Sequence, residues 1–466
     1  STATRRLMLN DKHGLEITAA NGDAVGHYDA TLSAFLGLAR DVGDHLKRTL
    51  DADRDMALAL CMRGYFMLLF CNPVLAPKAR KARDAARAAI EARGGTARER
   101  RHVDVLSRWL DGDLGGATDA WERILLDCPR DMLALRLAHF THFYSGDGRA
   151  MVGSVARVLH AWHDDAPDHG FLLGLHAFGL EESGDYVRAE ELGRRAVDIN
   201  PADIWAVHAV AHVLEMQGRQ HDGIAWLTGS QESWAGANNF AYHVWWHRCL
   251  YHLDLGDFDA VLTLYDDEVR ADRESTDYLD ISNAAALLWR LEAHGVAVGA
   301  RWVELADKSE RRVDDHLLAF ADAHFMLALA AEGREAAAET MLRSMRAAAE
   351  DGGSQGAVFK EVGLALCEAI WALGRGAHGE AVDLLHPVRA RLWRIGGSHA
   401  QRDLFDQMLI EAALGAGRLP LARALLSERT AARPNSGWGW GRYAEALDGL
   451  GDTDGAAAAR GQQSAL

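Results

Sequence analysis

The chain has 466 residues, a formal net charge of −17 and a hydrophobic fraction of 49%. Such an acidic chain is a poor partner for duplex nucleic acid, because that binding depends on neutralising phosphates with Lys and Arg. The five cysteines form no C-x-x-C pair, which argues against a zinc ribbon or a disulfide framework. No window approaches the roughly 18 uncharged apolar residues of a membrane span. We therefore expect no membrane partner and a soluble, cytoplasmic protein, unless a leader has been removed.

The N-terminal part predicts helices. Only eight prolines occur, and long Val/Ile/Thr alternations are missing, so there is little room for a sheet. The apolar spacing predicts four helices in this part, over residues 29–50, 56–70, 76–93 and 97–110. Thr96 is the expected N-cap of the last one. Residues 1–95 are expected to form an N-terminal helical cap.

A glycine period organises the rest of the chain. Intervals of about 34 to 39 residues, typical of stacked helix-turn-helix repeats, separate Gly112, Gly146, Gly184, Gly218, Gly256, Gly295 and Gly333. The series continues at less regular intervals with Gly374, Gly417 and Gly451. We predict one all-α domain over residues 1–466, an α-solenoid curled around a groove. Degenerate repeats would span residues 96–435, and residues 436–466 would form capping helices.

The clearest single unit is Gly170 to Asp203, G-F-L-L-G-L-H-A-F-G-L-E-E-S-G-D-Y-V-R-A-E-E-L-G-R-R-A-V-D-I-N-P-A-D. It has the small and large residues of a tetratricopeptide repeat at the expected places, with Gly174 where two helices pack closely and Gly184 at the turn. Pro201 closes the unit.

A family resemblance rests on four segments. They read N-P-A-D-I-W-A-V-H-A-V-A-H-V-L-E-M from Asn200, F-A-Y-H-V-W-W-H-R-C-L-Y-H-L-D from Phe240, L-T-L-Y-D from Leu262 and G-S-H-A-Q-R-D-L-F-D-Q from Gly397. With them the chain resembles tetratricopeptide repeat protein 38 and its bacterial relatives over roughly residues 20 to 435. The resemblance implies an α-solenoid of degenerate repeats. It supplies no reaction, substrate or catalytic residue.

Two pairs of histidines, each four residues apart on a predicted helix, are the main candidate site. Residues with this spacing share a helix face, so His208 with His212 and His243 with His247 can face one groove. Imidazoles four apart can bind one metal ion, as in H-E-x-x-H, although Ala209 replaces that motif's Glu. They can equally act without metal, as general acid and base. Both alternatives stay open, with zinc, manganese or iron as the candidate ions and these four histidines as the ligands.

Further residues stand at matching numbers of positions before their turn glycines, which places them at the same level of the helices and predicts that they face the same groove. The residues expected to carry chemistry are His208, His212, Glu215, His243, His247, His324, Arg402 and Asp403. Those expected to contact a substrate are Trp205, Trp245, Trp246, Trp289, Asp322, His399 and Gln401. Ser398 is the expected N-cap of the helix that carries Arg402.

Two functions fit these patterns. The first is a small-molecule enzyme or binder, of hydrolase or lyase type and acting on a small polar substrate, with the histidine-lined groove as its pocket. The second is a non-catalytic scaffold that binds a protein or peptide along the groove. A closed pocket with few Lys and Arg would favour the first, and an open basic channel the second. The oligomeric state, including a homo-oligomer, stays open.

Overall fold

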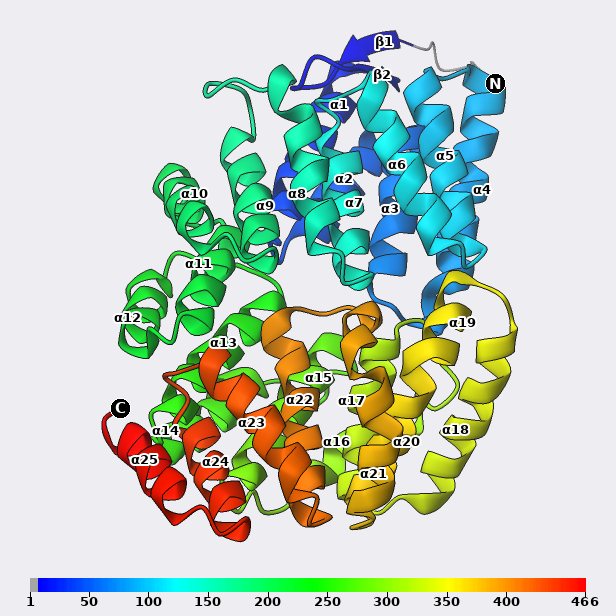
Figure 1. Ribbon diagram of the computed structural model, residues 1–466. Coiled ribbons are helices and arrows are strands. Elements are labelled where there is room, and N and C mark those ends of the chain that lie inside the picture. The colour runs from blue at the N-terminus through cyan, green and yellow to red at the C-terminus, as the bar shows by residue number, and fades with distance from the viewer. Residues whose placement is uncertain (1–6) are drawn as a thin grey trace. The chain divides into compact units, whose positions relative to one another are not determined.

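The computed structural model describes residues 7–466, which are mainly helical (Figure 1). The chain forms two compact units. The first runs to Val210 and includes Ser230–Ala241, and the second combines Ala211–Gly229 with Tyr242–Leu466. The expected single continuous domain stays a prediction.

The first unit begins with an antiparallel hairpin of β1 (Leu7–Asn10) and β2 (Glu16–Ala19). Its helices are α1 (Gly22–Leu36), α2 (Val42–Ala52), α3 (Ala57–Leu69), α4 (Ala76–Arg93), α5 (Ala97–Leu110), α6 (Leu114–Asp127), α7 (Met132–Tyr144), α8 (Gly148–Val158), α9 (His169–Glu182) and α10 (Tyr186–Ile199). Short 3-10 helices occupy Pro73–Leu75 and Leu159–Ala161. Helix α11 (Ile204–Met216) carries the chain from the first unit into the second.

The second unit continues in the same helical manner. Its helices are α12 (Gln220–Ser230), α13 (Phe240–Asp254), α14 (Phe258–Leu264), α15 (Tyr278–Ala293), α16 (Arg301–Glu310), α17 (Ala319–Ala331), α18 (Glu335–Glu350), α19 (Ser354–Val358), α20 (Leu364–Gly374), α21 (His378–Leu385), α22 (His399–Gly415), α23 (Leu419–Ala432), α24 (Gly437–Gly449) and α25 (Thr453–Ser464). Two π-helical turns, Tyr265–Val269 and Phe359–Gly363, and a 3-10 segment, His386–Ile395, join some of them.

The structure corrects the sequence prediction near the N-terminus in two places. The hairpin of β1 and β2 was not expected. The predicted helix over residues 29–50 is two helices, α1 and α2, because Leu38 takes a φ of 50° between them. There the amide of Arg40 donates to the carbonyl of Gly236, and Ala39 pairs with Ala237. This contact with a distant segment of the same unit draws the chain out of the helix.

The glycine period is confirmed. All seven glycines of the regular series have positive φ, between 63° and 84°, as do Gly417 and Gly451. At Gly374 the prediction was wrong, since that residue ends α20 and the turn uses Gly376, with φ of 77°. A Cβ at Gly374 would lie 2.8 Å from the Cβ of Ala330, so this glycine serves helix packing instead.

The best-matching repeat is also confirmed. Residues 170–203 form most of α9 and all of α10, joined at Gly184. A Cβ on Gly174 would lie 3.1 Å from a carboxylate oxygen of Asp203 and 3.3 Å from the Cβ of Ala206, which explains why a glycine stands at this close approach. The chain is therefore an all-α assembly of tetratricopeptide-like helix-turn-helix repeats.

The second unit closes on itself. The segment after α23 meets α11, where the guanidinium of Arg433 lies 3.6 Å from the carboxylate of Glu215. One step further, the side-chain amide of Asn435 donates to the carbonyl of Gly218 over 3.3 Å. The segment that follows α23 thus lies against the end of α11, and the two enclose a space. Within the described residues, no helix combines the length and apolar character that a membrane crossing needs.

Candidate functional site

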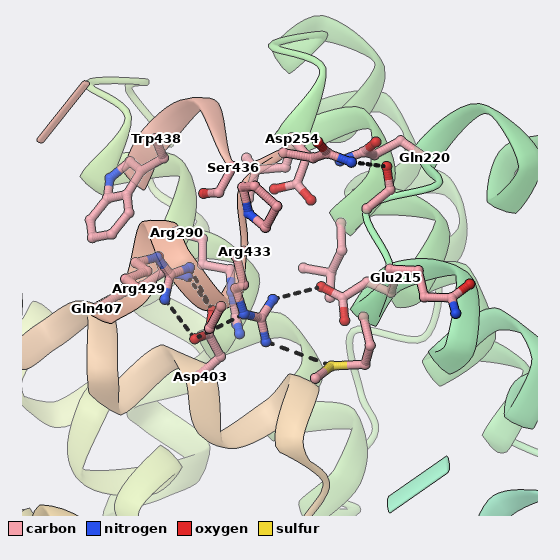
Figure 2. Close-up of a pocket in the computed structure, with 18 of the residues that line it drawn as sticks. Glu215, Gln220, Asp254, Arg290, Asp403, Gln407, Arg429, Arg433, Ser436 and Trp438 are labelled. Carbon is pink, nitrogen blue, oxygen red and sulfur yellow. Dashed lines mark hydrogen bonds and ion pairs between the residues drawn. The ribbon is translucent and has the colours of Figure 1, made fainter. Parts of the chain in front are cut away.

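A cavity of about 240 Å³ lies where the second unit closes (Figure 2). Helices α11, α13, α15, α22 and α24 contribute to its wall, together with the end of α23 and the segment that follows it. Its charged lining residues are Glu215, Asp254, Arg290, Asp403, Arg429 and Arg433. Three arginines therefore converge on one space in a chain of strongly negative net charge.

Asp403 anchors the basic side of this cavity. Its two carboxylate oxygens accept from the two terminal nitrogens of Arg429 at 2.7 and 2.9 Å, and the side-chain amide of Gln407 donates to it at 2.9 Å. Burial alone would raise the pKa of Asp403, but the charges of Arg429 and Arg433 outweigh it and hold that pKa well below its usual range. Asp403 is ionised, and both terminal nitrogens of Arg429 are bonded to it.

Arg433 is placed differently from Arg429. Its guanidinium lies 3.6 Å from Glu215 and 3.8 Å from Asp403, beyond hydrogen-bond distance of either carboxylate. The hydrogen bond that it does make is to the thioether sulfur of Met216, at 3.7 Å. Burial lowers the pKa of Arg433, but Asp403 and Glu215 together raise it above its ordinary value. Arg433 is thus a permanent cation whose donors no carboxylate in the described chain takes up directly.

Other polar atoms of the cavity also lack partners within the described residues. They are one carboxylate oxygen of Glu215, the Nε of Arg429 and the indole nitrogen of Trp438. Glu215 is 8% exposed, and burial raises its pKa against the opposing effect of Arg433. Arg290 contributes charge more than free donors, because its terminal nitrogens bond the carbonyls of Ala286 and Ala400. Burial lowers the pKa of Arg290 to about 10, so it too stays cationic.

A wider groove of about 770 Å³ lies next to the cavity. The two spaces share Asp254, Asn435 and Trp438 among their lining residues, so they adjoin. The outer groove extends along α24 to the end of the chain at Leu466. A narrow charged end and a longer open channel suit an extended ligand that enters with one terminus.

Three of the four predicted histidines lie together in the second unit. His212, from α11, and His243 and His247, from α13, are buried, and one ring nitrogen of each lies within 4.8 Å of the others. The Nε2 atoms of His243 and His247 are 3.1 Å apart. Burial lowers the pKa of all three, that of His243 to about 4, so the imidazoles are neutral. None of the three lines the cavity that contains Arg290, Arg429 and Arg433, which we call the arginine cavity.

His208 lies one helical turn before His212, in the part of α11 that belongs to the first unit. Its ring packs among Phe178, Trp205 and Phe240, with centroid distances of 5.1, 5.1 and 4.9 Å. Trp205 in turn donates its indole hydrogen to the Nε2 of His139 at 3.2 Å. The role predicted for His208 as a ligand stays a prediction.

Trp246 connects the histidines to the cavity. The Trp246 ring stacks on His243 at a centroid distance of 5.1 Å. The guanidinium of Arg290, a residue of α15, lies 5.3 Å from the centroid of the Trp246 ring. Trp245 points elsewhere and packs with Arg248. Trp289 is half-buried and does not line the cavity.

The remaining candidates are held in local contacts. His324 donates to the carbonyl of Phe320 at 2.8 Å, and burial lowers its pKa to about 4. Asp322 pairs with His316 at 2.7 Å, while burial raises its pKa to about 6. Neither lines the cavity.

The start of α22 is a helix cap. Ser398 is its N-cap, as predicted, and forms a reciprocal capping box with Gln401 at 2.9 and 3.1 Å. Arg402 donates to the carbonyls of Gly396 and Gly397. His399 is exposed, with its Nδ1 3.3 Å from Arg402. Of this group predicted to bind ligand, Asp403 alone lines the cavity.

Sequence reasoning missed Arg290, Arg429 and Arg433. Arg290 and Arg429 stand on helices and Arg433 is the residue that follows α23, and no local motif marks any of them. The available signal is the spacing of Arg429 and Arg433, which are four residues apart, about one helical turn, where α23 ends. Two cations at that spacing repel unless anions or a ligand face them.

No model of a known protein family matches the chain. Among solved structures, the tetratricopeptide repeat domain of P58(IPK) is similar at 13% identity, over 79% of this chain and 92% of that chain, with a TM-score of 0.22. The structure of Naa15/Naa10 bound to HypK-THB is similar at 12% identity, over 94% of this chain and 68% of that chain, with a TM-score of 0.25. Scores this low carry no argument, so the helical-repeat description rests on the helices and turn glycines of the chain itself.

Proposed function

We propose that this chain is a helical-repeat interaction protein that captures the carboxylate terminus of a peptide in the arginine cavity of its second unit. The observation that carries the proposal is Arg433, a partly buried permanent cation whose guanidinium lies 3.6 and 3.8 Å from the nearest carboxylates, beyond hydrogen-bond distance. A carboxylate matches the planar fork of a guanidinium, so the terminal carboxylate of a peptide could accept two parallel hydrogen bonds from Arg433.

The rest of the cavity supports a peptide over a compact metabolite. The indole nitrogen of Trp438, whose ring centroid lies 5.1 Å from the guanidinium carbon of Arg429, is a second donor in the cavity, and the oxygen of Glu215 can accept from a peptide N–H. The volume of about 240 Å³ is small for a drug-sized ligand but suits a chain end. The adjoining groove offers room for the preceding residues. Capture of a terminal carboxylate is a known mode of peptide recognition.

The test uses two pools of short fluorescein-labelled peptides with randomised sequence, one with a free C-terminal carboxylate and one amidated. Fluorescence polarisation on the full chain should show binding of the carboxylate pool, with the amidated pool weaker by about 10- to 100-fold, the value of a charge-assisted hydrogen-bond pair. Equal binding of the two pools, or binding of neither, would contradict the proposal.

A matched pair of variants locates the effect. Arg433→Met keeps a flexible, unbranched side chain but removes the charged fork, so it should abolish the preference for the free carboxylate. Arg418→Met is the control, because Arg418 pairs with Asp383 on the surface at the other end of α23. That variant should bind like the unmodified chain.

The histidines support a second candidate function, a small-molecule binder or enzyme of hydrolase or lyase type. The observation in its favour is the cluster of neutral imidazoles His212, His243 and His247. The variant His247→Ala separates the two candidates. If it binds the carboxylate pool as tightly as the unmodified chain does, peptide capture does not depend on the histidines. Membership of the tetratricopeptide repeat protein 38 family is part of this proposal and rests on the sequence segments alone.

A further inference from the structure

The histidine cluster of the second unit combines two helices that are held rigidly. His212 comes from α11, and His243 and His247 stand one turn apart on α13. The ring centroids of His212 and His247 are 4.2 Å apart, and those of His243 and His247 4.7 Å. Three imidazoles this close, two of them fully buried, can be bridged by a single atom.

The orientation of His243 is fixed from behind. Its Nδ1 lies 2.8 Å from the Oδ1 of Asn283, a residue of α15 that is 2% exposed. Since a carbonyl oxygen only accepts, Nδ1 carries the hydrogen, and the lone pair of Nε2 points toward His247. A second group that holds one ring nitrogen and presents the other is the usual arrangement behind a metal-ligating histidine.

The spacing of the ring nitrogens matches a metal polyhedron. Two imidazole nitrogens bound to one zinc ion at about 2.0–2.1 Å with a tetrahedral angle are about 3.3 Å apart. The observed distance between the Nε2 atoms of His243 and His247 is 3.1 Å. The same distance also allows a hydrogen bond between the two rings. A metal site and a ring-to-ring hydrogen bond are distinguished by whether the protein binds a metal ion.

We propose that His212, His243 and His247 form a three-histidine site for a divalent zinc-class ion. Three neutral imidazoles and no carboxylate favour zinc, and by the same ligand preference cobalt as a spectroscopic substitute. This site is separate from the arginine cavity, and the inference does not depend on the peptide proposal. His208, the fourth histidine of the sequence prediction, is not needed for it.

The experiment measures metal in the full chain, purified without a His-tag or chelating column from zinc-supplemented culture. Elemental analysis should find about one equivalent of zinc per chain, and His247→Ala should reduce it below about a tenth. His324→Ala is the matched control. His324 is equally buried in the second unit, and its ring bonds the carbonyl of Phe320, so this variant should keep its zinc.

Two further measurements keep the test independent of folding in the His247 variant. Protein stripped by chelator and titrated with Co²⁺ should develop the visible absorption of a four-coordinate site. Asn283→Ala should weaken zinc binding by about 10- to 100-fold, the effect of losing such a supporting group. Stripped wild-type protein that binds neither Co²⁺ nor Zn²⁺, or zinc lost equally from the His324 control, would overturn the inference and leave the rings hydrogen-bonded to each other.

Discussion

Replacing Asp403 by Asn should strongly destabilise the second unit. Asp403 and Arg429 are about nine-tenths buried, and their side chains form two parallel hydrogen bonds of 2.7 and 2.9 Å. The amide that replaces the carboxylate has no charge and only one acceptor oxygen. The buried cation Arg429 would then lose its ionised partner, and the partly buried Arg433 would lose a nearby negative charge.

The magnitude follows from burial. Removing one partner of a buried ion pair costs about 3–5 kcal/mol, because an uncompensated charge is left behind. The pH dependence has a definite sign. The folded pKa of Asp403 is depressed, so its contribution is fully present above the unfolded pKa of about 3.9 and is lost as pH falls through the folded value. The difference between the two proteins should thus be constant near neutrality and shrink only in acid.

Urea unfolding followed by tryptophan fluorescence measures this difference, and a second aspartate provides the comparison. Asp383 also binds an arginine of the α23 region, Arg418, through both terminal nitrogens, at 2.6 and 3.2 Å, but on the open surface. Asp383→Asn should leave the transition almost unchanged, since water screens exposed pairs. If both variants unfold at the same urea concentration, the buried Asp403 pair is no more stabilising than the exposed Asp383 pair.

Two other predictions follow from the same unit. Gly223→Ala should cost about 1–3 kcal/mol, because its Cβ would lie 2.3–2.6 Å from ring atoms of the buried Tyr251, whereas Gly229→Ala on the same helix meets nothing within 4 Å and should be neutral or gain up to about 1 kcal/mol. Urea midpoints that do not differ between these two would contradict the packing of α12 on α13. Glu215→Gln should strengthen binding of the carboxylate peptide pool several-fold, because it removes a negative charge beside Arg433. A weaker affinity in the polarisation assay would mean instead that Glu215 binds a cation of the ligand.

The parts of the fold that the sequence could predict are those with local causes. A turn that needs positive φ selects glycine, so the seven regular turn positions were visible. The helices at residues 76–93 and 97–110 also agree with α4 and α5, and Thr96 caps α5 through a capping box. The break between α1 and α2 could not be predicted, because it depends on a hydrogen bond between Arg40 and Gly236, far apart in the chain.

The same distinction separates the two candidate sites. His243 and His247 were found because a four-residue spacing on one helix places them together whatever the rest of the chain does, and their Nε2 atoms indeed lie 3.1 Å apart. Arg433 had no such local mark. Its character comes from the closure of the second unit, which brings it to Met216, 217 residues away, and to Glu215 beside it. A charged residue in a repeat protein can thus acquire its chemistry from the curvature accumulated over many repeats, which no single repeat contains.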